Sequence, residues 1–118
     1  MAEETEKPLD QQAREQTGQR QVSLRIDDRE MTTIYANAFR SNGSAEEMML
    51  DFGINVVGSS PAQAGKPAQP EILFKVNNRV VMNWYSAKRL AITLAQLIRR
   101  HEEQFGAMEL DVAKRAKK

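Results

Sequence analysis

The chain has 118 residues, the ordinary length of one domain. Its 41% hydrophobic and 28% charged residues are typical of a folded soluble protein, and its net charge of +1 indicates no overall attraction to nucleic acid or to an anionic membrane. The absence of cysteine excludes disulfides, thiolate nucleophiles and thiolate metal sites. No secretory apolar region opens the chain, and no apolar run approaches the roughly 20 residues that span a bilayer. We therefore expect a cytoplasmic protein.

Composition divides the chain into one domain and three flexible pieces. Residues 1–20 are polar and glutamine-rich, so they cannot bury enough surface to offset the entropy of ordering them, and we expect a disordered arm. Residues 58–70 hold three prolines and two glycines, which predicts a flexible loop. Residues 113–118 form a basic tail. A single α+β domain is expected over residues 21–112.

Two strand signals come first in chain order. Val22, Leu24 and Ile26 alternate with polar residues, the pattern of a half-buried strand. Asn42-Gly43 then separates two apolar runs, residues 32–41 and 44–57, and this dipeptide favours a two-residue type I′ hairpin turn. That turn would pair Ser41 with Ser44 and Phe39 with Glu46. One face would then gather the bulky residues Tyr35, Phe39, Met48, Leu50 and Phe52, continued by Ile54 and Val56.

Residues 71–82 predict a further strand. A regular alternation would place Leu73 and Val81 on one side of it, opposite the larger set Ile72, Phe74, Val76, Val80 and Met82. Apolar residues on both sides indicate a central or interface-lining strand. A tight turn at Asn77-Asn78, which would split the strand in two, is the less favoured alternative.

From about Trp84 the apolar period changes to that of one helix face. Asn83 or Ser86 can cap its start, and Gly106 can end it. Met108, Leu110 and Val112 then alternate, as in an extended segment. The predicted fold is α+β, an antiparallel sheet of about four strands packed on one long C-terminal helix.

Five sequence blocks occur in an order that resembles a known family. They are Tyr35-Ala36-Asn37 with Phe39-Arg40, then Leu50-Asp51-Phe52-Gly53, Arg79-Val80-Val81-Met82, Ala87-Lys88-Arg89-Leu90 and Phe105-Gly106. Over about residues 22–112 the chain is similar to domain-of-unknown-function family 3467, a family of small prokaryotic proteins. Trp84 stands where members often carry proline. The resemblance implies no activity, substrate or catalytic residue. A second likeness, of fold only, is to SecB-type export chaperones, which are oligomeric.

No catalytic, cofactor-binding or metal-binding residues are predicted. Asp51-Phe52-Gly53 spells a kinase magnesium motif, but 118 residues cannot hold the other parts of a kinase, so a strand with Phe52 inward is the better interpretation. His101 is the only histidine, and Phe105 stands where a zinc-protease helix would carry a second one. We expect a protein that is not an enzyme. A carboxylate-only active site is the disfavoured alternative.

Two functional hypotheses remain. One helix can cover only one face of the sheet, so the other face would be left as an apolar association surface, which indicates a homo-oligomeric interaction module such as a chaperone or an adaptor. The alternative is a nucleic-acid-associated accessory protein that contacts phosphates with basic residues of the helix and the tail. The predicted oligomer interface is Ile34, Ala36, Ala38, Met49, Leu73 and Val81, and the possible nucleic-acid contacts are Lys88, Arg89, Arg99, Arg100, Lys114 and Arg115.

Overall fold

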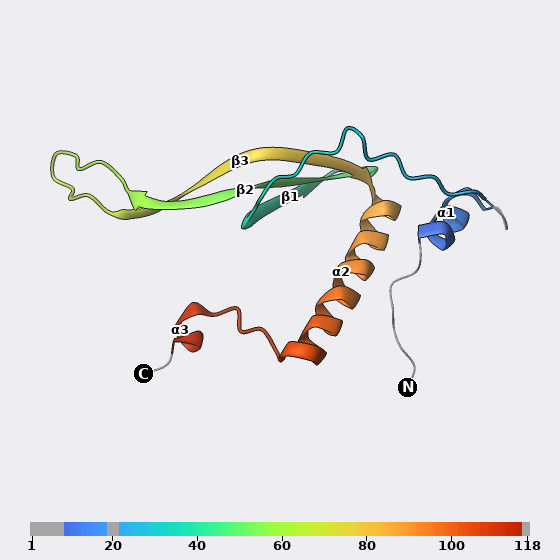
Figure 1. Ribbon diagram of the computed structural model, residues 1–118. Coiled ribbons are helices and arrows are strands. Elements are labelled where there is room, and N and C mark those ends of the chain that lie inside the picture. The colour runs from blue at the N-terminus through green and yellow to red at the C-terminus, as the bar shows by residue number, and fades with distance from the viewer. Residues whose placement is uncertain (1–8, 19–21, 117–118) are drawn as a thin grey trace. The chain divides into compact units, whose positions relative to one another are not determined.

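A computed structural model describes residues 9–18 and 22–116. The chain divides into two compact units, residues 28–87 in one and the residues before and after them in the other, and each unit is described by itself. The elements are those of an α+β protein with one long helix and an antiparallel sheet, as predicted, but the described residues form three strands rather than about four. In chain order they are α1 (Leu9–Thr17), β1 (Ala38–Gly43), β2 (Glu47–Ser59), β3 (Pro70–Asn83), α2 (Trp84–Phe105) and α3 (Val112–Arg115) (Figure 1).

The sheet has the strand order β1-β2-β3, with each neighbouring pair antiparallel. β1 has six residues, whereas β2 has 13 and β3 has 14. β2 and β3 therefore continue beyond the end of β1 as a two-stranded ribbon, which Figure 1 shows as the long twisted part of the sheet. Residues 60–69 close this ribbon. They lie inside the predicted loop, because β2 extends to Ser59 and β3 begins at Pro70.

The strand predicted around Val22, Leu24 and Ile26 does not form. The described residues before β1 contain no strand, and Leu24 and Ile26 are exposed. Period-two alternation shows only that a segment could fit a half-buried sheet position, and a strand also needs a neighbouring edge to satisfy its backbone groups. The sheet consequently has one strand fewer than the pattern predicts.

The hairpin between β1 and β2 forms, but its predicted register is wrong. The chain reverses over residues 44–47, where the N–H of Ser44 donates to the carbonyl oxygen of Glu47 at 2.9 Å. Gly43 pairs with Met48, and Phe39 pairs with Phe52 rather than with Glu46. Neither Asn42 nor Gly43 has the positive φ that a type I′ turn requires. Glycine is needed at residue 43 for a different reason, because a Cβ there would lie 2.7 Å from Cζ2 of Trp84.

The predicted sorting of side chains onto faces survives this change of register. The midpoint of the turn moves from between residues 42 and 43 to between residues 45 and 46, so each partner changes by six positions, an even number. Since side chains alternate with period two, the residues within β1 and β2 stay on the predicted face, whereas Tyr35, predicted to lie with them, precedes β1. One face of the three-stranded part carries no charged residue, and we call it the uncharged face. Its positions are Phe39, Ser41, Gly43, Met48, Leu50, Phe52, Asn78, Val80 and Met82.

A β-bulge in β3 corrects the predicted faces of that strand. Phe52 pairs with Asn78 and Gly53 pairs with Val76, so Asn77 has no partner and the alternation inverts on either side of it. The strand is continuous, so the alternative turn at Asn77-Asn78 is wrong as well. Leu73 and Val81, predicted on one side, lie on opposite faces. So do the two parts of the larger predicted set, with Ile72, Phe74 and Val76 on one face and Val80 and Met82 on the other.

The helix boundaries agree with the predicted capping residues. Asn83 caps α2, because its Oδ1 accepts a hydrogen bond from the N–H of Ser86 at 2.8 Å. Gly106 ends the helix with a φ of 96°, and its N–H donates to the carbonyl of Glu102 at 2.8 Å. Residues 106–111 form no strand.

The two terminal segments are partly helical. α1 occupies part of the predicted disordered arm, and α3 occupies residues 113–115 of the predicted basic tail. Residues 1–8, 19–21 and 117–118 lie outside the described residues. None of the helices in the described part of the chain combines the length and apolar character that a bilayer crossing needs.

Candidate functional site

The centre of the sheet holds an arginine–aspartate cluster formed by Arg40, Asp51 and Arg79, one residue from each strand. The register places Arg40 and Arg79 directly opposite Asp51 on either side. Arg79 donates to both carboxylate oxygens, from Nε to Oδ1 at 2.6 Å and from an Nη to Oδ2 at 3.0 Å. Arg40 donates from Nε to Oδ2 at 2.8 Å. Cross-strand partners of opposite charge stabilise a sheet, and hydrogen bonds between ionised groups are the stronger kind.

The cluster keeps its carboxylate ionised. Asp51 is only 4% exposed, although the side chains of Arg40 and Arg79 remain 62% and 52% exposed. The hydrogen bonds from Arg79, and then those from Arg40, hold the pKa of Asp51 well below its usual range. The same carboxylate raises the pKa of Arg79. The cluster therefore carries one net positive charge at neutral pH, on the face opposite the uncharged face.

Next to this cluster the two long strands approach closely. A Cβ at Gly53 would collide with the carbonyl oxygen of Lys75 and would lie 2.9 Å from Cε1 of Phe74. Only a residue without a side chain fits there, because the bulge brings the β3 backbone against β2. Gly53 is thus part of the geometry that places Asp51 between its two arginines.

Trp84 joins the first turn of α2 to the β1–β2 hairpin. Its indole N–H donates to the carbonyl oxygen of Ser44 at 2.8 Å, and its ring lies over Gly43. Trp84 is the first residue of the helix, a position that also accepts proline because its N–H has no partner within the helix. The departure from the family pattern at this residue is therefore compatible with the same helix start.

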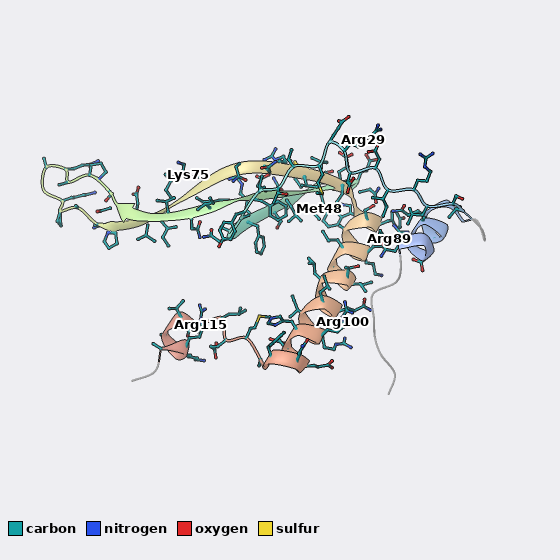
Figure 2. The ribbon with its side chains drawn as sticks, viewed as in Figure 1. Arg29, Met48, Lys75, Arg89, Arg100 and Arg115 are labelled. Atoms are coloured by element: carbon teal, nitrogen blue, oxygen red, sulfur yellow. The ribbon has the colours of Figure 1, made fainter. Side chains whose placement is uncertain are left out.

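The sheet has very little apolar core of its own. Among the described residues, Met48 is the only buried large apolar side chain. Figure 2 places it in the three-stranded part. Exposed apolar residues lie on both faces of the sheet. On the face of Met48 they are Phe39, Ile54, Val56, Leu73 and Val80, and on the opposite face they are Val57, Ile72, Val76 and Val81.

The six predicted interface residues do not form one surface. Ala38, Met49 and Val81 share the face of the arginine–aspartate cluster, whereas Leu73 lies on the other face, in the two-stranded ribbon. Ile34 and Ala36 precede β1. Their role in oligomerisation stays a prediction.

The predicted nucleic-acid contacts belong to two helices. α2 carries Lys88, Arg89, Arg99 and Arg100, and α3 carries Lys114 and Arg115. Nucleic-acid binding also stays a prediction.

The sequence contained one usable signal for the arginine–aspartate cluster. Opposite charges on neighbouring strands favour direct pairing. In the expected hairpin register, however, Arg40 faces Ala45, so the pairing of Arg40 with Asp51 was hidden. The bulge likewise could not be placed from the sequence, and it sets which residue of β3 faces Asp51.

These features define an α+β protein built on a three-stranded antiparallel sheet with an ion-paired centre and apolar surfaces. The chain belongs to the family described as "Protein of unknown function (DUF3467)", whose pattern matches residues 1–110. This confirms the family resemblance. Neither the curated proteins nor the solved structures include a match to the chain. The likeness to SecB-type export chaperones stays a prediction.

Proposed function

We propose that this protein is a cytoplasmic, non-enzymatic, homo-oligomeric interaction module of the kind that serves as a chaperone or an adaptor. The observation that supports it is the sheet itself, which exposes apolar side chains on both faces while burying a single large apolar residue among those described. Contiguous exposed apolar surface of this kind marks sites of association.

The magnitudes favour association over a stable lone subunit. A valine, leucine, isoleucine or phenylalanine side chain contributes about 1.5–3 kcal/mol when it passes from full exposure to full burial. Small domains are stable by only about 5–15 kcal/mol in total. Phe39, Leu73 and Val81 are 70%, 53% and 51% exposed, so their complete burial would contribute about 3–5 kcal/mol, close to the lower end of that range.

Size-exclusion chromatography with light scattering tests the proposal. The protomer mass is 13.4 kDa, and we expect a multiple of it that persists from low to high micromolar concentration. Replacing Phe39 with serine on the uncharged face should lower the average mass, whereas Ser41→Thr, on the same face and strand, should leave it unchanged. A strict monomer at high micromolar concentration contradicts the proposal.

A further inference from the structure

We propose that two copies of the chain join edge to edge along β3, antiparallel and around a two-fold axis at Leu73, so that their three-stranded sheets become one six-stranded sheet. This inference rests on the proposed homo-oligomer and adds to the contact through the apolar sheet face a second, separate contact, with its own seam, register and partner, a second copy of the same strand. The seam is the five-residue segment Glu71-Ile72-Leu73-Phe74-Lys75.

β3 offers a free edge for this pairing. It is the last strand in the order β1-β2-β3, and within residues 9–18 and 22–116 no other strand pairs with its outer side. Unpaired strand edges are ready templates for another chain. The ribbon part also lacks a third strand, and two strands alone are only marginally stable in water.

Some backbone N–H and C=O groups of the seam face away from β2, and they belong to the residues that a partner strand would pair with. On β2, the carbonyl oxygen of Gly53 accepts from the N–H of Asn37, and the N–H of Asn55 donates to Oδ1 of Asn37, so these two groups face the side of β1. The N–H of Ser60 faces the other side, where it donates to the carbonyl oxygen of Gln69 across the ribbon. Alternation from these bonds turns the backbone groups of Glu71, Leu73 and Lys75 toward β2. Those of Ile72 and Phe74 therefore face away from β2 and are available to a partner strand.

The side chains of the seam are self-complementary about Leu73. An antiparallel two-fold there pairs Leu73 with its own copy, Ile72 with the partner's Phe74, and Glu71 with the partner's Lys75. Ile72 and Phe74 are the residues with outward backbone groups, so they form the hydrogen-bonded pairs. Glu71 and Lys75 meet in a non-hydrogen-bonded pair, where side chains lie closer together. Figure 2 shows the Lys75 side chain projecting from the ribbon.

Neighbouring registers lose this match. Moving the axis by one residue to Ile72 places Glu71 opposite the partner's Leu73, and moving it to Phe74 places Lys75 there. Either choice sets a charge against an apolar side chain and leaves its ion-pair partner elsewhere. Charge complementarity therefore selects the axis at Leu73 and selects a second copy as the occupant.

The competing explanation is that Lys75 and Pro70 protect a solvent-exposed edge, as lysine and proline do at the edges of many sheets. Under that explanation the sign of the charge at residues 71 and 75 has no effect on association. If the seam forms, association requires charges of opposite sign at residues 71 and 75.

Charge reversal separates the two explanations. Glu71→Lys alone and Lys75→Glu alone each set like charges across the seam, and each should weaken dimerisation by about tenfold, most strongly at low salt. The double variant E71K/K75E restores opposite charges and should return close to the wild-type dissociation constant. Sedimentation equilibrium over a range of protein and salt concentrations measures this, with circular dichroism to confirm folding. Equal effects of the single and double variants overturn the seam.

Disulfide trapping tests the register directly, since the chain contains no cysteine. Leu73→Cys would place two cysteines in a non-hydrogen-bonded pair across the axis, where the Cα atoms are about 4.5 Å apart, within the range that a disulfide spans. Val81→Cys is the matched control, because Leu73 and Val81 lie in the same strand and are 53% and 51% exposed. We expect a covalent dimer on mild oxidation from the first variant and not from the second.

The outcomes distinguish this inference from the proposed function. An oligomeric wild type that forms no Leu73→Cys dimer, or that cross-links equally at both residues, overturns the seam and leaves the oligomer standing. A monomeric wild type overturns both.

Discussion

Gly53 lies in β2 where the bulge of β3 presses the backbone of Lys75 against it. A Cβ at this residue would overlap the carbonyl oxygen of Lys75, lie 2.8 Å from its carbonyl carbon and lie 2.9 Å from Cε1 of Phe74. Two of these three contacts are with backbone, which cannot rotate away as the end of a side chain can. Gly53→Ala should therefore push β2 and β3 apart next to the arginine–aspartate cluster.

The expected cost follows from the number of atoms that must move. Forcing one extra methyl group into a closely packed position costs about 1–3 kcal/mol, and the backbone contacts place Gly53→Ala in the upper part of that range. Gly58, five residues further along the same strand, provides the matched control. A Cβ there meets nothing within 4 Å, and its φ is not positive. Gly58→Ala should be neutral or stabilise by up to about 1 kcal/mol, since alanine restricts the unfolded chain.

Urea unfolding of the two variants, monitored by circular dichroism, measures the difference. Because oligomerisation makes stability depend on concentration, both variants and the wild type must be compared at one protomer concentration. We expect a lower midpoint for Gly53→Ala and an unchanged or higher one for Gly58→Ala. Equal midpoints for the two variants would refute the inference that the bulge holds the strands in close contact at Gly53.

Three further predictions concern the sheet centre and the start of α2. The hydrogen bonds from Arg79 and Arg40 hold the pKa of Asp51 below its usual 3.8. The ionised Asp51 carboxylate therefore contributes its full stabilisation to the folded state above pH 3.8, and this contribution is lost as the pH falls from 3.8 toward the folded-state pKa. Asp51→Asn should lower the urea midpoint at neutral pH, and the gap to wild type should narrow on acidification below 3.8; a constant gap would contradict this. Asn83→Ala removes the helix cap and should cost about 1 kcal/mol, with Asn83→Asp retaining most of it, measured by thermal unfolding. Trp84→Phe loses the 2.8 Å bond to Ser44 and also the ring atoms Cζ2 and Cη2 that lie against Gly43, so it should cost at least about 0.5–1.5 kcal/mol in the same assay.

The side-chain faces of the β1–β2 hairpin could be predicted from the sequence, but its register could not. Bulky residues recur with period two, and any even change of partner keeps them together, so Phe39 meets Phe52 on the predicted face. The turn itself was misplaced because the preference of Asn42-Gly43 for positive φ is only local, and a contact made elsewhere in the folded chain can use the glycine in a different conformation. At Gly43 that contact is the indole ring of Trp84, which is 41 residues distant along the chain.

Long-range pairing also explains the errors in the other strands. The alternation at Val22, Leu24 and Ile26 is correct as a local pattern, yet only an available edge would make it a strand. In β3 the apolar residues on either side of the polar run Asn77-Asn78-Arg79 keep the same period-two phase, since Val76 and Val80 are four residues apart, so their spacing does not mark the position where the faces invert. The end of helix α2 was predicted at Gly106, and Asn83 is one of the two residues predicted to cap its start, because both are local signals that act on adjacent backbone groups.

The bulge at Asn77, which made the predicted faces of β3 wrong, also limits the length of the proposed seam. On one side of Asn77 the outward backbone groups belong to Ile72 and Phe74, and on the other side the change of register transfers them to Arg79 and Val81. A partner strand that follows the first set cannot continue along the second without a matching bulge of its own. At the opposite end, Pro70 has no N–H to donate. The free edge of β3 is thus divided into a short segment with complementary charges and a separate segment that carries Arg79, already paired with Asp51. A strand edge that can pair over only a few residues, and in only one register, joins two copies without recruiting further chains.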